Sequence, residues 1–153
     1  MKIAIGADHG GYKLKSKLIK FLKGRSYLVA DLGTHDLKRC DYPAIGYKVA
    51  ASVSSGSFQR GILICKTGIG FSIVANKLAG IRAALCLSAL QAQRSREHNN
   101  ANVLCLSANY LNLKQATKIV DRWLKTEFSG GRHARRVRQI GNIERKAKKA
   151  SRS

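Results

Sequence analysis

Short apolar runs alternate along this chain with longer segments in which apolar residues recur every three or four positions. Five of the short runs predict buried β-strands, because Ile, Val, Leu and Ala dominate them and glycine or polar residues bound them. The predicted strands are residues 2–7, 27–30, 61–65, 81–87 and 102–106.

The longer segments between these strands have the spacing of amphipathic helices. In residues 12–22, the apolar positions 14, 18, 21 and 22 predict a buried face, and the lysines at 13, 15, 17, 20 and 23 predict a solvent-exposed face. Gly24 is expected to end this helix, and Pro43 to begin the next. The predicted helices are residues 12–22, 43–54, 71–78, 89–98, 113–124 and 133–149.

This alternation from end to end predicts an α/β fold with a five-stranded parallel sheet and helices on both faces. The length fits a single domain, residues 1–153, with residues from about 146 onward expected to fray. In such sheets ligands bind beyond the carboxyl ends of the strands. Candidate polar residues follow three of the strands there: Asp8-His9, Asp41-Tyr42 and the segment 65–70.

The segment 61–70 gives the sharpest indication of chemistry. A predicted buried strand ends in Cys65, and a loop with two glycines and then a helix follow it. Backbone N–H groups of such a loop, the positive end of a helix and the charge of Lys66 would all favour a thiolate. Proton transfer at carbon needs such a base, together with a cradle for negative charge. The alternatives are a core thiol for Cys65 and helix capping for Thr67.

Three more groups are candidates for ligand contacts. The two glycines after Asp8 and His9 would let an anion approach the first helix; the alternative is a helix cap and a surface histidine. His98 is a candidate general acid or base near neutral pH, or else a residue that caps its helix. Arg132 and Arg136 lie four apart on a predicted helix, which suits a phosphate group or, alternatively, a solvated basic face.

The formal net charge of +21 fits a nucleic acid, an anionic metabolite or a generally basic background. Residues 132–153 hold nine Lys/Arg and one acid, and the first 131 residues hold twenty against seven, so the excess is diffuse. Aromatic residues make up 7% of the chain, and no RNA-recognition motif is found. Specific nucleic-acid binding is therefore not favoured.

Cysteine usage and hydropathy indicate a cytoplasmic protein. The four cysteines lie far apart without a CxxC pair, which argues against a disulfide framework, and Cys86 and Cys105 are expected in the core. No signal-peptide pattern or run of transmembrane length is found. The four histidines are scattered without paired ligand spacing, so no metal site is predicted.

Together these segments resemble one family, the type B ribose-5-phosphate isomerases, which share their fold with galactose-6-phosphate isomerase subunits. The matching stretches follow the family's order over nearly the whole chain. They are residues 5–11, 31–34, 41–43, 61–70, 75–77, 80–82, 95–99 and 130–133, with Arg136.

The resemblance implies a Rossmann-like three-layer α/β/α sandwich without a cofactor. It also implies a homodimer or tetramer in which the C-terminal helix packs on a partner subunit and active sites are shared. The implied reaction interconverts an aldose phosphate and a ketose phosphate through an enediolate, as in the pentose phosphate pathway. Ribose 5-phosphate and ribulose 5-phosphate are the expected pair.

The resemblance also implies roles for individual residues. Cys65 would move the proton between C1 and C2, because Phe71 stands where some members carry a glutamate base. Thr67 would assist the thiol, and His98 would open the furanose ring. The implied substrate-binding residues are Asp8, His9, Asp41, Tyr42, Lys66, Gly68, Ile69, Gly70, Asn99, Arg132, His133 and Arg136, with Arg132 and Arg136 reaching from the neighbouring subunit.

This sequence departs from the family at two positions. Lys66 stands where the family usually has glycine, and Asn109 where it usually has a phosphate-binding arginine. Two alternatives to the expected function therefore stay open. One is a galactose-6-phosphate isomerase subunit or an isomerase of another phosphorylated aldose. The other is a basic nucleic-acid-binding protein on an inactive isomerase scaffold.

Overall fold

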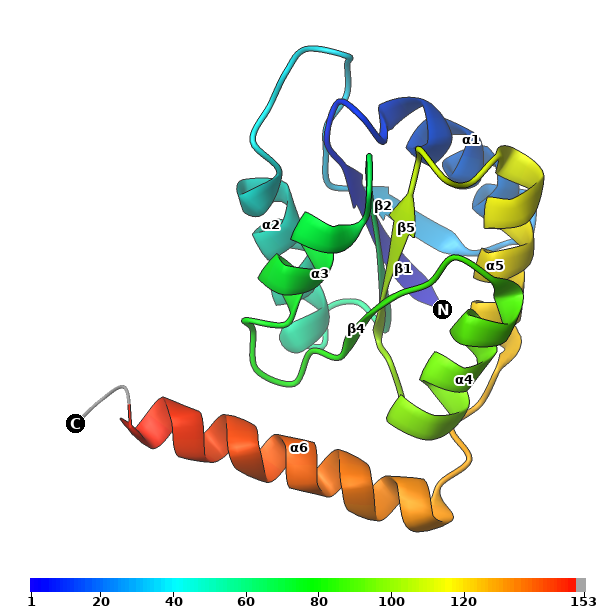
Figure 1. The fold of residues 1–153 in the computed structure, drawn as a ribbon. Helices are drawn as coiled ribbons and strands as arrows, with labels where there is room; N and C mark the ends of the chain where they lie inside the picture. Colours follow the sequence, from blue (N-terminus) through cyan, green and yellow to red (C-terminus); the bar gives the residue numbers. More distant parts are fainter. Residues whose placement is uncertain (151–153) are drawn as a thin grey trace.

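A parallel sheet between two layers of helices forms the centre of the molecule (Figure 1), in a computed structural model that describes residues 1–150. Its strands are β1 (Lys2–Ala7), β2 (Leu28–Asp31), β3 (Arg60–Cys65), β4 (Ala83–Leu85) and β5 (Val103–Ser107). They are ordered β2-β1-β3-β5-β4, and every neighbouring pair is parallel. The predicted α/β fold and five-stranded parallel sheet are confirmed.

Helices cover both faces of this sheet. On one face lie α1 (Tyr12–Lys23), α4 (Ala89–Asn99) and α5 (Leu113–Lys125); on the other lie α2 (Tyr42–Ser54) and α3 (Ile69–Ala75). The strand predicted over 81–87 is shorter because side chains take its terminal N–H groups. Arg82 N–H donates to Asn102 Oδ1 at 2.8 Å, and Leu87 N–H donates to Gln91 Oε1 at 2.7 Å.

Each face of the sheet carries its own apolar cluster. Successive residues of β3 point to opposite faces, so Ile62 and Ile64 join the cluster with Trp123 of α5, whereas Leu63 and Cys65 join the cluster with Phe71 of α3. Burial of one such large apolar side chain contributes about 1.5–3 kcal/mol. This packing fixes β3, which carries Cys65 to the carboxyl edge of the sheet.

Lys15 corrects the prediction for the first helix. Four of the five lysines there are solvent-exposed as predicted, but Lys15 is fully buried and forms an ion pair with Asp31. The residue follows Leu14 and precedes Leu18 by three positions, so it lies at the border of the apolar face. The periodicity of α1 alone does not reveal that Asp31 lies opposite Lys15 on that side.

The last helix, α6 (Gly131–Ala150), lies below the sheet, across the amino ends of the strands (Figure 1). None of its residues is buried, and Glu144 Oε1 accepts a hydrogen bond from Gly80 N–H at 2.8 Å. A cavity of about 720 Å³ separates part of α6 from the body and is lined by Ile81, Ile140 and Ile143 among others. Residues 146–150 are helical, and the remainder of the predicted frayed tail lies outside the described residues.

No helix within residues 1–150 is both long enough and apolar enough to span a bilayer.

Candidate active site

The order of strands changes direction between β1 and β3, which places a crevice beyond their carboxyl ends. Asp8 and His9 follow β1 directly, and Cys65 ends β3. Gly11 lets the turn after β1 lie against β3, because a Cβ at this position would be 2.1 Å from the carbonyl oxygen of Ile64. The sheet therefore brings two of the predicted segments together, as expected.

Cys65 lies in this crevice with 6% of its surface exposed. The N–H of Gly68 donates to its Sγ at 3.1 Å. Gly68 has a φ of +78°, a conformation that favours glycine and turns its N–H back toward the strand end. The glycine loop therefore places a backbone N–H donor against the sulfur at the end of β3.

The other buried thiols differ in their surroundings. Burial raises the pKa of Cys86 to about 11, against which a hydrogen bond with Ser95 acts, and burial also raises the pKa of Cys105. Both are therefore protonated thiols in the core at neutral pH, as predicted. All four cysteines are free, so the predicted absence of a disulfide framework is in accord with the structure.

The loop after Cys65 is held from β5 and from the start of α3. Ser107 Oγ donates to Lys66 O at 2.6 Å, and Asn109 N–H donates to the same oxygen at 3.0 Å. Thr67 Oγ1 accepts from Ile69 N–H at 3.3 Å, in a turn one residue before Gly68, the N-cap of α3. These bonds fix the loop backbone before any ligand binds.

Asp8 and His9 each have one polar atom engaged. Asp8 Oδ1 accepts from Gly11 N–H at 3.1 Å, so the carboxylate also serves as a turn residue. His9 Nδ1 accepts from Cys40 N–H at 3.4 Å. In the neutral ring the proton then lies on Nε2, which leaves that nitrogen as a donor for an anionic group.

Lys66 and Tyr42 border the same crevice. A Cβ on Gly10 would lie 2.6 Å from Lys66 Cγ and 3.3 Å from Asp8 Oδ1, so the lysine side chain runs across the turn after β1. A Cβ on Gly70 would lie 2.7 Å from the Tyr42 ring, which covers the glycine loop. Asp41, the residue before α2, is exposed. The residues predicted after three strands therefore meet at one edge.

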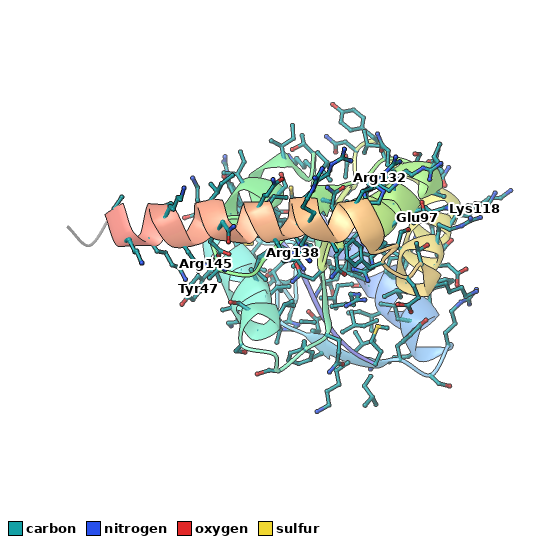
Figure 2. All side chains as sticks on the ribbon, turned by 90° about the horizontal axis from the view of Figure 1, so that it is seen from below. Tyr47, Glu97, Lys118, Arg132, Arg138 and Arg145 are labelled. Atoms are coloured by element: carbon teal, nitrogen blue, oxygen red, sulfur yellow. The ribbon has the colours of Figure 1, made fainter. Side chains whose placement is uncertain are left out.

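The remaining predicted residues form a second group on α4 and α6. The rings of His98 and His133 stack with centroids 4.2 Å apart and an interplanar angle of 8°. Partial burial lowers the pKa of His133, and the charges of His98, Arg132 and Arg136 lower it further. Figure 2 shows Arg132 at the end of α6 that lies by Glu97 of α4. Asn99 and Arg136 complete this group, and both are exposed.

The two groups lie at opposite edges of the sheet. Asn102, three residues after Asn99, accepts a hydrogen bond from Gly61 N–H at the start of β3, whereas Cys65 O accepts from Ala108 N–H at its end. At about 3.3 Å per residue, a strand of this length separates the edges by roughly 13 Å. One chain therefore does not bring His98, Arg132 or Arg136 to Cys65.

Two residues of this region were not among the predicted site residues. Ser107 is buried and holds the carbonyl of Lys66, and a polar residue after the predicted strand 102–106 was its available signal. Lys15 was assigned to solvent, and only the tertiary contacts reveal its place. Within residues 1–150, no cluster of three or more His, Cys, Asp or Glu is placed to hold a metal ion.

The sequence of this chain matches a known protein family and several of its members. A model of the family described as ribose/galactose isomerase matches residues 3–140. Ribose-5-phosphate isomerase B of Escherichia coli is 46% identical over 145 residues, which cover 95% of this chain and 97% of that protein.

Solved structures agree with this match. Ribose-5-phosphate isomerase B of Clostridium thermocellum superposes with a TM-score of 0.95 at 56% identity, covering 96% of this chain and 99% of that one. The Mycoplasma genitalium enzyme with bound ribulose-5-phosphate has a TM-score of 0.91 at 42% identity, covering 94% and 96% of the two chains. With the fold, the crevice and the family model in agreement over most of its length, the chain belongs to the ribose/galactose isomerase family.

Proposed function

We propose that this protein interconverts ribose 5-phosphate and ribulose 5-phosphate. The hydrogen bond from Gly68 N–H to Cys65 Sγ, at the carboxyl edge of the sheet, is the observation that carries the proposal. It supports a thiolate base in the position where ligands of such sheets bind. Relatives at 46% and 56% identity carry the name ribose-5-phosphate isomerase B, which supports this choice of substrate.

In the proposed reaction, the Cys65 thiolate removes the proton from C2 of the open-chain aldose. The electron pair forms the C1–C2 double bond and leaves negative charge on the former carbonyl oxygen. Return of the proton to C1, with transfer of the C2 hydroxyl proton to the C1 oxygen, gives the ketose. Backbone N–H groups of the loop 66–70 stabilise the enediolate oxygen, and Thr67 assists the thiol.

The remaining residues of the crevice hold the substrate in this proposal. Asp8, Asp41 and Tyr42 contact sugar hydroxyls, and His9 donates its Nε2 proton to the phosphate. Lys66 supplies a positive charge beside Asp8, since its side chain crosses the turn that carries both Asp8 and His9. No cofactor takes part, because the proton shuttle needs only a base and a stabilised oxyanion.

A second copy of the chain completes the site in this proposal. His98, Asn99, Arg132, His133 and Arg136 lie at the opposite edge of the sheet, so within one chain they have no route to Cys65. A twofold-symmetric dimer lets each copy present these residues to the other. The apolar cavity beside α6, lined by Ile140 and Ile143, is a surface that such a partner covers.

Turnover of ribose 5-phosphate by the wild-type protein and by Cys65→Ala tests the proposal. We expect wild-type conversion to ribulose 5-phosphate and a loss of about 10²–10⁴ in kcat for the variant, the typical contribution of a general base. Cys40→Ala is the matched control, because the substitution keeps the backbone N–H of Cys40 that donates to His9. Full activity of Cys65→Ala, or exclusive turnover of galactose 6-phosphate in a substrate panel, contradicts it.

A further inference from the structure

The ammonium group of Lys15 is enclosed beneath the candidate active site. The residue is 0% exposed, and its Nζ donates to Asp31 Oδ1 at 2.6 Å, to Asp31 Oδ2 at 2.5 Å and to the carbonyl oxygen of Thr34 at 2.6 Å. A protonated lysine has three N–H donors, so these bonds use its full capacity. The buried charge is therefore completely compensated.

Stability alone does not account for a charge at this position. Desolvation of two charges offsets much of their attraction, and an apolar pair of similar size often serves as well or better. Leu14 and Leu18 are neighbours of Lys15 on the buried face of α1, so apolar side chains are accommodated on this face. The charged lysine differs from an apolar residue in that its hydrogen bonds fix the backbone of Thr34 as well as the side chain of Asp31.

The segment that Lys15 holds is bound to the end of β1. Gly33 O accepts from Ala7 N–H, and Thr34 N–H donates to Ala7 O, both at 2.5 Å. Asp31 Oδ1 also accepts from Gly33 N–H at 3.1 Å. Ala7 immediately precedes Asp8 and His9. Lys15, the segment 31–34 and the last residue of β1 thus form one connected set of hydrogen bonds.

The same segment leads into the other side of the crevice. From Thr34 the chain runs through an irregular stretch to Cys40, whose N–H donates to His9 Nδ1, and then to Asp41 and Tyr42. Tyr42 covers Gly70 of the glycine loop. The stretch of chain that carries Cys40, Asp41 and Tyr42 thus begins where Thr34 is held, and Tyr42 also packs edge-on against Phe71 with ring centroids 5.7 Å apart.

We propose that Lys15 is a positioning residue, which acts through the segment 31–34 to set the substrate-binding side chains His9, Asp41 and Tyr42. This inference rests on the proposed function for its kinetic consequence. Cys65 and its loop are carried by β3 and α3, and among the described residues neither contacts the Lys15 ammonium group. Lys15 thus governs substrate binding more than the proton-transfer step.

The kinetic test uses Lys15→Met and the charge-free pair Lys15→Met with Asp31→Asn, which avoids leaving a carboxylate unpaired. We expect KM for ribose 5-phosphate to rise about tenfold or more, because misplaced binding groups lose orientation, while kcat stays within about threefold. Lys17→Met, an exposed site on the same helix, is the matched control and leaves both constants unchanged. Leu18→Ala lowers stability without touching the ion pair and leaves KM unchanged.

Amide hydrogen exchange gives a second readout that needs no catalytic activity. We expect faster exchange at Ala7 and Thr34 in both Lys15 variants, with exchange at Gly68 as in the wild type. Unchanged KM in a folded charge-free variant overturns the inference, as does an equal rise of KM in Leu18→Ala or unchanged exchange at Thr34. A wild-type protein without isomerase activity refutes the proposed function instead, and the exchange result then decides the role of Lys15.

Discussion

At the scale of single residues, Cys65 and Cys105 show how surroundings decide what a thiol does. They lie on the neighbouring strands β3 and β5, and both belong to the same apolar cluster. Cys105 lies in mid-strand, where burial raises its pKa and keeps it protonated. Cys65 lies at the strand end, where a glycine N–H reaches its sulfur. Because Cys105 pairs with Leu63 and Ser107 pairs with Cys65, a shift of two positions along the strand direction separates a core thiol from a candidate base.

Substitution of Lys66 tests how much its positive charge contributes to the proposed binding of the anionic substrate. We expect Lys66→Ala to raise KM for ribose 5-phosphate about two- to fivefold with little change in kcat, since an exposed charge contributes about 0.2–1 kcal/mol. The rise should shrink as salt is added, because salt screens exposed charges. Steady-state kinetics at two ionic strengths measure both effects.

Lys23→Ala is the control for this substitution, because Lys23 is exposed and ends α1 at the opposite edge of the sheet. Equal effects of the two substitutions would show that only the overall positive charge of the protein matters. A KM unaffected by Lys66→Ala would remove this side chain from the substrate-binding residues.

At the scale of elements, the junction of α4 and α6 stands out because α6 has no buried residue. Its contacts with the body include the stacked rings of His98 and His133, the bond from Ser129 N–H to Glu97 O, and the bond from Gly80 N–H to Glu144. Figure 2 shows this long helix crossing the amino edge, with Arg138 and Arg145 farther along it than Arg132. Because none of its residues is buried, the packing of α6 responds to changes in charge at the junction.

The pH dependence of this junction follows from His133. Partial burial and the nearby positive charges lower its pKa from the ordinary value of 6.5, so the folded junction favours the neutral ring. The unfolded chain takes up this proton at a higher pH than the folded one. The stabilisation is therefore complete above about pH 6.5 and is lost as pH falls through the lowered pKa of the folded state.

We accordingly expect amide exchange within α6 to accelerate as pH falls from 7.5 to 5, after correction for intrinsic rates. His133→Gln should flatten this dependence because the titrating group is gone. His35→Gln removes an exposed histidine that lies near Asp31, away from α6, and should leave the slope unchanged. A slope that persists in His133→Gln would assign the effect to another group.

At the scale of the whole molecule, the two groups of candidate site residues lie at opposite edges of the sheet. Asp8, His9 and Cys65 follow parallel strands and so meet at the carboxyl edge. His98 lies in the last turn of a helix that returns to the amino edge, and Arg132 lies on a helix that begins there. Parallel βαβ connections impose this separation, because each helix runs opposite to the strands.

Mixing two inactive variants tests whether two copies share their sites. Cys65→Ala and His98→Ala should each be inactive alone, but a mixed dimer regains one intact site. Random association gives mixed dimers in half of the population, so about a quarter of wild-type activity should return. Turnover is measured after joint refolding, with mixed dimers verified by mass spectrometry.

Joint refolding of Cys65→Ala with Cys65→Ser is the control for this experiment, since no pairing of these variants restores the thiol. Verified mixed dimers without recovered activity would exclude shared sites. Activity that appears in the control would indicate contamination by wild-type protein and not complementation.

Local sequence determined most of the fold and half of the candidate site. Five apolar runs and their glycine boundaries predicted the strands to within a few residues. A strand that is buried on both faces needs an apolar residue at nearly every position, so it appears in the sequence as a continuous apolar run. The carboxyl-edge residues were predictable for a related reason: each follows a strand directly, so topology alone gathers Asp8, His9 and Cys65.

Tertiary structure alone decided the burial of Lys15 and the distance between the two groups of site residues. The pattern of residues in α1 does not indicate that Asp31 lies opposite Lys15, because the contact joins residues sixteen positions apart. The sequence likewise does not show that His98 and Arg132 lie at the other edge of the sheet from Cys65, because this depends on the direction of their helices. Periodicity records which side of an element is buried, whereas partners and edges follow only from how the elements are placed in space.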